Sequence, residues 1–180
     1  MSHNTHILVA NAYSATHDRA MELVKDLTET QLSWRADKMA PSVRFHVWHV
    51  ARWADLVQEI FNGAGTQLWD QDHLGERWGF PMGGLGTAEA GGGIDDATAL
   101  KLPLPEKEPL LEYGLRTFAK SNQAVTTAAE ATVDRVRINT AAAEYFGEEA
   151  AFVDIVLRML RHDNRHVGNI ESLRGLLGLS

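Results

Sequence analysis

Apolar residues recur at steps of three and four along four stretches of this chain, a spacing that places them on one face of an α-helix. The sequence therefore predicts four long helices, over residues 5–27, 43–61, 109–134 and from 148 or 149 to 177. Every strong periodic signal along the chain is of this helical kind. We therefore expect an all-α fold.

The ends of these helices carry residues that suit helix termini. Thr28, followed three residues later by Gln31, matches a capping box, so a short helical turn should follow the first long helix. Ser42 is a favoured N-cap ahead of the second helix, and Gly63 suits its end. Pro109 is well placed in the first turn of the third helix.

Residues 62–108 lack helical periodicity, and we refer to them as the crossover. Glycine occurs there at positions 63, 65, 75, 79, 83, 84, 86, 91, 92 and 93, and proline at 81, 103 and 105. A connection this long suits a functional lid, or a link between helices that are not adjacent antiparallel partners. A short helix over residues 95–100 is expected inside it, and residues 136–147 are expected to form another connection.

The length and composition fit one domain. The chain has 180 residues, 44% of them hydrophobic, and a single core grows to roughly 250 residues before it splits. We therefore expect one domain over residues 1–180, with the crossover inside it. The formal net charge of −7 argues against nucleic-acid binding, because such binding needs clustered Lys and Arg side chains.

The sequence carries no pattern typical of a secreted or membrane protein. Residues 1–10 lack the basic start and apolar run of a signal peptide, and no stretch approaches the roughly 20 apolar residues of a membrane span. We therefore expect a soluble, cytoplasmic protein. The chain contains no cysteine, which excludes disulfides, thiolate metal sites and a cysteine nucleophile. Any bound metal must take nitrogen or oxygen ligands.

Four histidines fall on the apolar faces of two predicted helices. His46 and His49 lie in the same arc as Trp53 on the helix over residues 43–61. His162 and His166 are four residues apart, which brings their Cβ atoms to about 5–6 Å from each other. Both rings of that pair can therefore reach one metal ion.

A single histidine on an apolar face is most often a core residue whose ring nitrogens are satisfied by neighbours. Several imidazoles buried together would leave polar atoms unpaired at a cost of roughly 1–3 kcal/mol each, whereas one cation satisfies them all. The cluster therefore predicts a metal site with zinc or nickel first, and iron or copper next. Only one of His46 and His49 is expected to bind, and His46 could instead be an outer-shell partner or a general base. Three ligands leave one coordination position for water or substrate.

Other polar residues near these faces have ordinary explanations. His17 is predicted to be a core histidine rather than a ligand, and Asn169 could bond to a ligand or to a backbone group. Asp163 lies about 100° around the helix from His162, so we expect a solvated residue or a partner for nearby arginines. The tryptophans at positions 48, 69 and 78 are predicted to be core or interface residues that could also line a pocket.

Three other kinds of site are excluded by the residues present. The chain contains no Glu-x-x-His, which a ferritin-like di-iron centre needs on two helices. Residues 162–166 have Asp where the His-Glu-x-x-His of metalloproteases has its Glu base. Residues 84–89 lack the third glycine of a dinucleotide-binding fingerprint and follow no predicted strand.

Four short motifs occur in order along the chain. They are residues 29–35 (ETQLSWR), 41–49 (PSVRFHVWH), 161–168 (RHDNRHVG) and 173–178 (LRGLLG). Together they resemble the DinB-like, YfiT-like superfamily of helical-bundle metalloenzymes. The resemblance implies a four-helix bundle with an up-down-down-up path, in which the crossover joins the second and third helices. It also implies that the metal ligands are His49, His162 and His166, with His46 outside the triad.

The resemblance also suggests a function. Some characterised relatives are transferases and isomerases that use a low-molecular-weight thiol, which the metal activates as thiolate; homodimers are common in the family. A thiol-dependent transferase acting on a small molecule is therefore expected, with hydrolysis by metal-activated water as an alternative. The sequence equally allows a non-catalytic stress-response or ligand-sequestering protein whose metal is structural, with His46 as a fourth ligand.

Overall fold

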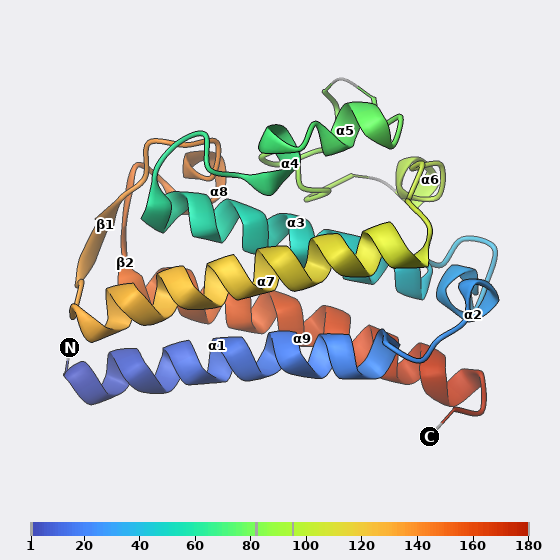
Figure 1. Cartoon of the computed structure of the whole chain (residues 1–180), viewed down its shortest axis with the longest axis horizontal. Helices are drawn as coiled ribbons and strands as arrows, with labels where there is room; N and C mark the ends of the chain where they lie inside the picture. Colours follow the sequence, from blue (N-terminus) through green and yellow to red (C-terminus); the bar gives the residue numbers. More distant parts are fainter. Residues whose placement is uncertain (1, 82, 95, 180) are drawn as a thin grey trace.

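The computed structural model describes residues 2–81, 83–94 and 96–179. Four long helices lie side by side in it (Figure 1), and they are α1 His3–Val24, α3 Val43–Asn62, α7 Lys107–Glu130 and α9 Phe152–Leu176. The predicted, mostly helical fold is therefore confirmed. Among the described residues, no helix combines the length and the apolar character needed to cross a membrane.

The contacts between α1 and α9 show that these two helices run in the same direction. Near their starts the ring of His6 stacks on that of Phe152, with centroids 4.9 Å apart. Nearer their ends Arg19 pairs with Glu171 at 2.7 Å. The other two long helices, α3 and α7, run the opposite way and pack closely against each other (Figure 1). The crossover therefore spans the length of the molecule to join two parallel helices.

The predicted cap residues act as expected. Thr28 caps α2 (Glu29–Ser33), because its hydroxyl accepts a hydrogen bond from the backbone N–H of Gln31 at 3.2 Å. The Gln31 side chain in turn accepts from the backbone N–H of Thr28 at 2.8 Å. The hydroxyl of Ser42 accepts from the backbone N–H of Phe45 at the start of α3. Gly63 ends α3 with a φ of 100°, a conformation that favours glycine.

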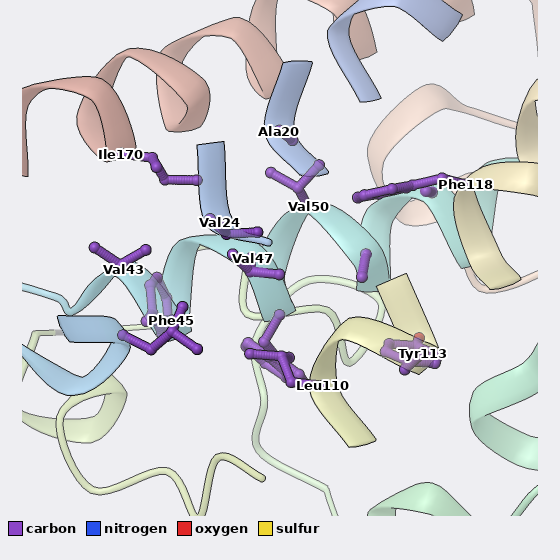
Figure 2. Close-up of a cluster of buried hydrophobic side chains, with 14 of the residues drawn as sticks. Ala20, Val24, Val43, Phe45, Val47, Val50, Leu110, Tyr113, Phe118 and Ile170 are labelled. Atoms are coloured by element: carbon purple, nitrogen blue, oxygen red, sulfur yellow. The ribbon is translucent and has the colours of Figure 1, made fainter. Parts of the chain in front are cut away.

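The core lies where the inner faces of the long helices meet. Helix α3 supplies its central strip and packs against residues of α1, α7 and α9 (Figure 2). The labelled members of this cluster are Ala20, Val24, Val43, Phe45, Val47, Val50, Leu110, Tyr113, Phe118 and Ile170. Trp48 and Trp69 are also buried, whereas Trp78 is partly buried against the same cluster. The tryptophans at 48 and 69 are therefore core residues.

In the part of the crossover that the structure describes there are three short helices, α4 (Leu68–Gln71), α5 (Leu74–Arg77) and α6 (Asp96–Ala99). The last of these confirms the short helix expected over residues 95–100, although Asp95 lies outside the described residues. Helices α4 and α5 were not predicted, because four residues are too few to show a helical period. The crossover is thus ordered by tertiary contacts rather than by its local sequence.

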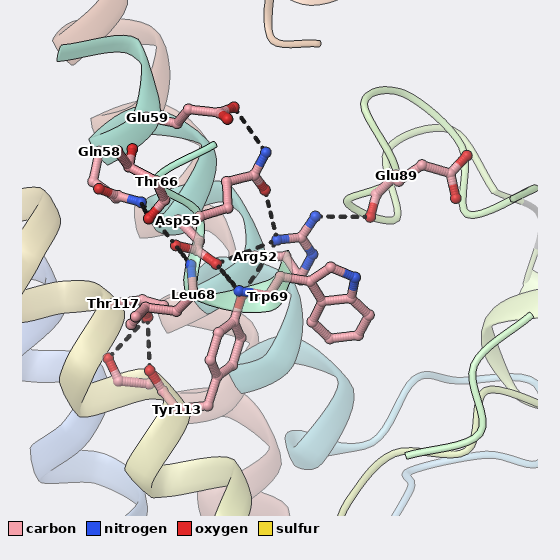
Figure 3. Close-up of polar contacts among 12 residues, drawn as sticks. Arg52, Asp55, Gln58, Glu59, Thr66, Leu68, Trp69, Glu89, Tyr113 and Thr117 are labelled. Carbon is pink, nitrogen blue, oxygen red and sulfur yellow. Dashed lines mark hydrogen bonds and ion pairs between the residues drawn. The ribbon is translucent and has the colours of Figure 1, made fainter. Parts of the chain in front are cut away.

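The main such contact is a buried polar network around Asp55 of α3 (Figure 3). Its carboxylate accepts hydrogen bonds from the backbone N–H groups of Leu68 and Trp69 at 2.9 and 2.8 Å. It also accepts one from the hydroxyl of Tyr113 on α7 at 3.0 Å. Arg52, one turn before Asp55, lies 3.5 Å from the same carboxylate. This network fastens the crossover to α3 and α7.

The prediction that the fourth long helix begins at residue 148 or 149 is wrong. Residues Glu149–Ala151 form a strand, β2, which pairs antiparallel with β1, Arg135–Arg137. In β1 the buried side chain of Val136 lies between two exposed arginines, which is the alternation typical of a strand. Three residues are too few for this alternation to be recognised in the sequence. A further short helix, α8 (Ala143–Phe146), lies between the strands. The fold therefore adds one small hairpin to the helices.

Candidate metal centre

Three histidines from α3 and α9 meet in the interior of the molecule. One turn of α9 separates His162 from His166, and their ring centroids are 4.7 Å apart. The Nε2 atom of His49 on α3 lies 3.0 Å from Nε2 of His162. One nitrogen from each of the three rings lies within 4.8 Å of the other two. We refer to His49, His162 and His166 as the histidine cluster.

The histidine cluster has the composition and spacing of a site for a divalent transition metal. Two nitrogens bound to one zinc ion lie roughly 3.3 Å apart, given zinc–nitrogen bonds of about 2.0–2.1 Å. In the cluster, Nε2 of His49 and Nε2 of His162 are 3.0 Å apart, and the three nitrogens all lie within 4.8 Å of one another, so small ring movements would suffice. His49 and His162 are buried and His166 is partly buried. The cluster could therefore hold a metal ion.

Burial keeps the imidazoles of His49 and His166 in the neutral form that a metal requires. Desolvation, helped by the neighbouring His162, lowers the pKa of His49 well below its usual value. Desolvation, followed by the effects of His49 and His162, lowers the pKa of His166 to about 2. Both rings are therefore neutral near pH 7, and each has a nitrogen lone pair to offer.

His46 lies beside the histidine cluster rather than within it. Its Nδ1 atom is 2.9 Å from Nδ1 of His166, close enough for a hydrogen bond in which one ring donates and the other accepts. Burial lowers the pKa of His46 to about 4. His46 can therefore orient the ring of His166 as a neutral partner.

The structure contradicts the prediction that Asp163 is solvated or paired with an arginine. Its side chain is only 1% exposed, and one carboxylate oxygen lies 2.8 Å from Nδ1 of His162. The other oxygen lies 3.4 Å from Nε2 of His17. The side of α9 that carries Asp163 faces α1, which the sequence pattern of α9 alone does not reveal. Burial by itself would raise the pKa of Asp163, but hydrogen bonding by His162 and then His17 lowers it.

His17 is a buried core residue of α1, as predicted, and it lies outside the histidine cluster. Its ring stacks on that of Phe118 with centroids 4.2 Å apart. Asn169 is exposed on α9.

Trp53, which was predicted only to face the core, contacts the ring of His162 with centroids 5.4 Å apart. The sequence could have indicated this contact, because Trp53 is a large aromatic residue one helical turn after His49.

The crossover lies directly against His49. Gly91 has a φ of +84°, and a Cβ atom there would lie 2.8 Å from Nδ1 of His49 and 2.9 Å from a ring carbon of Trp48. Glycine is required here both by the backbone conformation and by the lack of space. The crossover therefore helps to close the histidine cluster off from solvent.

Replacing Gly91 with alanine should separate these two requirements. The Gly93→Ala variant is the matched control, because Gly93 has a φ of +76° but no atom near the position of its Cβ. Gly93→Ala should lower the free energy of unfolding by about 1–2 kcal/mol through backbone strain. Gly91→Ala should lower it by about 1–3 kcal/mol more, because the methyl group also displaces neighbours. Urea unfolding measures both values, and equal losses would contradict the contact with His49.

Comparison with known proteins supports the expected family. The family model described as the DinB superfamily matches residues 12–170. The chain belongs to the DinB superfamily. No curated protein matches it significantly. For this DinB superfamily member, the matched region includes His46, all three residues of the histidine cluster, and Asp163.

Proposed function

We propose that this protein binds one divalent transition metal ion through His49, His162 and His166, and that zinc or nickel is preferred over iron or copper. The convergence of three ring nitrogens in a buried site carries this proposal. Imidazole nitrogen suits these metals better than magnesium or calcium. The four long helices would then form the up-down-down-up bundle expected for the family, with ligands on its second and fourth long helices.

We further propose that the protein is an enzyme that transfers a low-molecular-weight thiol to an electrophile. When bound, the metal would supply Lewis acidity that lowers the pKa of a thiol or of water. Three protein ligands leave room for such a molecule, and the chain has no cysteine nucleophile of its own. Trp53 contacts the ring of His49 with centroids 6.4 Å apart, and Gly91 lies against the same ring, so both line the site.

A second candidate function is favoured by His46. Its contact with His166 places a fourth imidazole beside the histidine cluster, so a small rearrangement could complete a site with four protein ligands. Such a site would be structural, and the protein would then sequester a ligand or serve a stress response without catalysis. X-ray absorption on the metal-loaded protein distinguishes the two, because four nitrogen ligands and no solvent would favour the structural role. Hydrolysis by metal-activated water is the alternative enzymatic activity.

The first experiment measures metal content by plasma mass spectrometry on untagged protein. We expect close to one metal per chain in the wild type, and none in a His49→Ala variant purified identically. The loaded protein is then assayed with cysteine or glutathione and a chromogenic electrophile. Metal without any thiol dependence would remove the transferase proposal and leave metal binding intact. Wild-type protein that neither contains metal nor takes up added zinc or nickel would overturn both the metal-binding proposal and the transferase proposal.

We also propose a cytoplasmic homodimer. Large apolar side chains remain exposed on three long helices, with Leu8 on α1 68% exposed, Leu115 on α7 56% exposed and Leu157 on α9 45% exposed. Such side chains gain from burial against a second copy. Light scattering should therefore give a mass near twice that of the chain, and a monomer at all concentrations would remove this part of the proposal.

A further inference from the structure

A chain of buried polar contacts leads from the histidine cluster to helices that carry no ligand. It starts at His162, whose Nδ1 lies 2.8 Å from one oxygen of Asp163. The second oxygen of Asp163 lies 3.4 Å from Nε2 of His17 on α1. Nδ1 of His17 lies 2.7 Å from the side-chain oxygen of Asn122 on α7. Three helices, α9, α1 and α7, thus contribute to one line of contacts.

The carboxylate in this chain determines which nitrogen of His162 carries the proton. An ionised carboxylate can only accept hydrogen bonds, so Nδ1 of His162 must be the donor. The other nitrogen, Nε2, then carries the lone pair, and it is the atom that lies 3.0 Å from Nε2 of His49. The hydrogen bond also fixes the rotation of the ring. Contacts of this kind orient the ligands of known metal sites.

We propose that Asp163 is a positioning residue of the metal centre, which holds His162 in the Nδ1–H tautomer with Nε2 directed at the metal position. This inference rests on the proposed metal site. A buried carboxylate is costly unless it is paired; here one oxygen accepts from His162 and the other lies 3.4 Å from Nε2 of His17, whose ring packs against it.

His17 is itself firmly placed. Its ring lies between two aromatic side chains, stacked on Phe118 and edge-on to Tyr13 with centroids 4.4 Å apart. Asn122 fixes the far side of the ring. The rotation of His162 therefore depends on α1 and α7, although neither helix supplies a ligand. Substitutions on α1 should alter metal binding on α9.

Asparagine is an informative replacement for Asp163 because it keeps the shape and changes the hydrogen bonding. One of its two polar groups is an NH₂ donor, so only its single oxygen could still accept from His162. An amide nitrogen that faces His162 would favour the opposite tautomer, with the proton on Nε2. That tautomer has no lone pair to offer at the metal position.

The direct test is nitrogen-15 NMR of the metal-free protein with labelled histidine, which distinguishes the two tautomers of each ring. We expect His162 to be in the Nδ1–H form in the wild type and to show a weaker preference for that form in Asp163→Asn, because a neutral amide oxygen is a weaker acceptor than a carboxylate. A wild-type His162 with its proton on Nε2 would overturn the proposal without any variant. This measurement of the tautomer needs neither bound metal nor an activity assay.

The second measurement is zinc affinity by competition with a chelator. Asp163→Asn should bind zinc about 10–100-fold more weakly than the wild type, and His17→Gln should weaken it in the same direction by less. The matched controls are Asp55→Asn, another fully buried carboxylate, and His6→Gln, another buried histidine of α1. Both controls should keep wild-type zinc affinity even where they lower the free energy of unfolding.

The outcomes separate this inference from the proposed function. Wild-type protein that binds zinc, with Asp163→Asn binding equally tightly, would overturn the positioning role and leave the metal site standing. Equal weakening by Asp163→Asn and Asp55→Asn would overturn it too, because general destabilisation would then explain the loss. Wild-type protein that binds no zinc would overturn the metal site and with it the role of Asp163.

Discussion

Replacing Asp55 with alanine is expected to lower the free energy of unfolding by about 3–5 kcal/mol, the typical cost of removing one partner from a buried charged network. The carboxylate is fully buried and accepts from the backbones of Leu68 and Trp69 and from the hydroxyl of Tyr113. Without it, these three donors lose their acceptor and Arg52 remains buried with its positive charge unpaired by Asp55. Denaturant unfolding followed by circular dichroism measures the loss.

The control for this prediction is Asp26→Ala, because Asp26 is exposed and surface substitutions usually change stability by less than about 0.5 kcal/mol. The Asp55→Asn variant should lose an amount of stability between those of Asp26→Ala and Asp55→Ala, because the amide keeps one acceptor oxygen. A loss below about 1 kcal/mol for Asp55→Ala would show that the crossover is held by its apolar contacts and that the network contributes little.

Replacing His162 with alanine is expected to weaken zinc binding by more than about 100-fold, because loss of a ligand should exceed the 10–100-fold effect of losing an outer partner. The ring of His162 is central to the site, since it contacts both His49 and His166 within the histidine cluster. Isothermal titration or chelator competition on the metal-stripped protein gives the affinity.

His6→Ala is the matched control for this second prediction. His6 is as buried as His162 but lies at the start of α1 and stacks on Phe152, so zinc affinity should stay within about threefold of the wild type because distant sites act independently. If His162→Ala retained wild-type affinity, His46 and His49 with His166 would have to hold the metal, and the triad proposed here would be wrong.

The two predictions involve different helices, because Asp55 lies on α3 and His162 on α9. Asp55 fastens the crossover to α3, and the crossover in turn brings Gly91 against His49. Loss of the Asp55 network should therefore lower the stability of the fold and loosen the crossover beside His49, while the ligands on α3 and α9 keep their zinc affinity. A variant that is less stable yet binds zinc normally would show that the wall and the ligands are independent.

Local sequence was sufficient wherever the deciding interactions lie within a few residues of each other. The capping box of Thr28 and Gln31, the N-cap at Ser42 and the glycine at position 63 all act between near neighbours. The same is true of His162 and His166, because one turn of helix fixes their separation. For this reason the long helices and two of the three residues of the histidine cluster could be predicted from the order of residues.

Tertiary structure decided what depends on which helices become neighbours. The apolar stripe of α9 shows where its core face lies, but only the packing of α1 against it buries Asp163 beside His17. Helices α4 and α5 are too short to show a period, and the network around Asp55 fixes the start of α4. The meeting of His49 with His162, and the approach of Gly91, join segments far apart in the chain. Such contacts form because buried polar groups need partners, and the sequence alone does not say which partners the fold brings within reach.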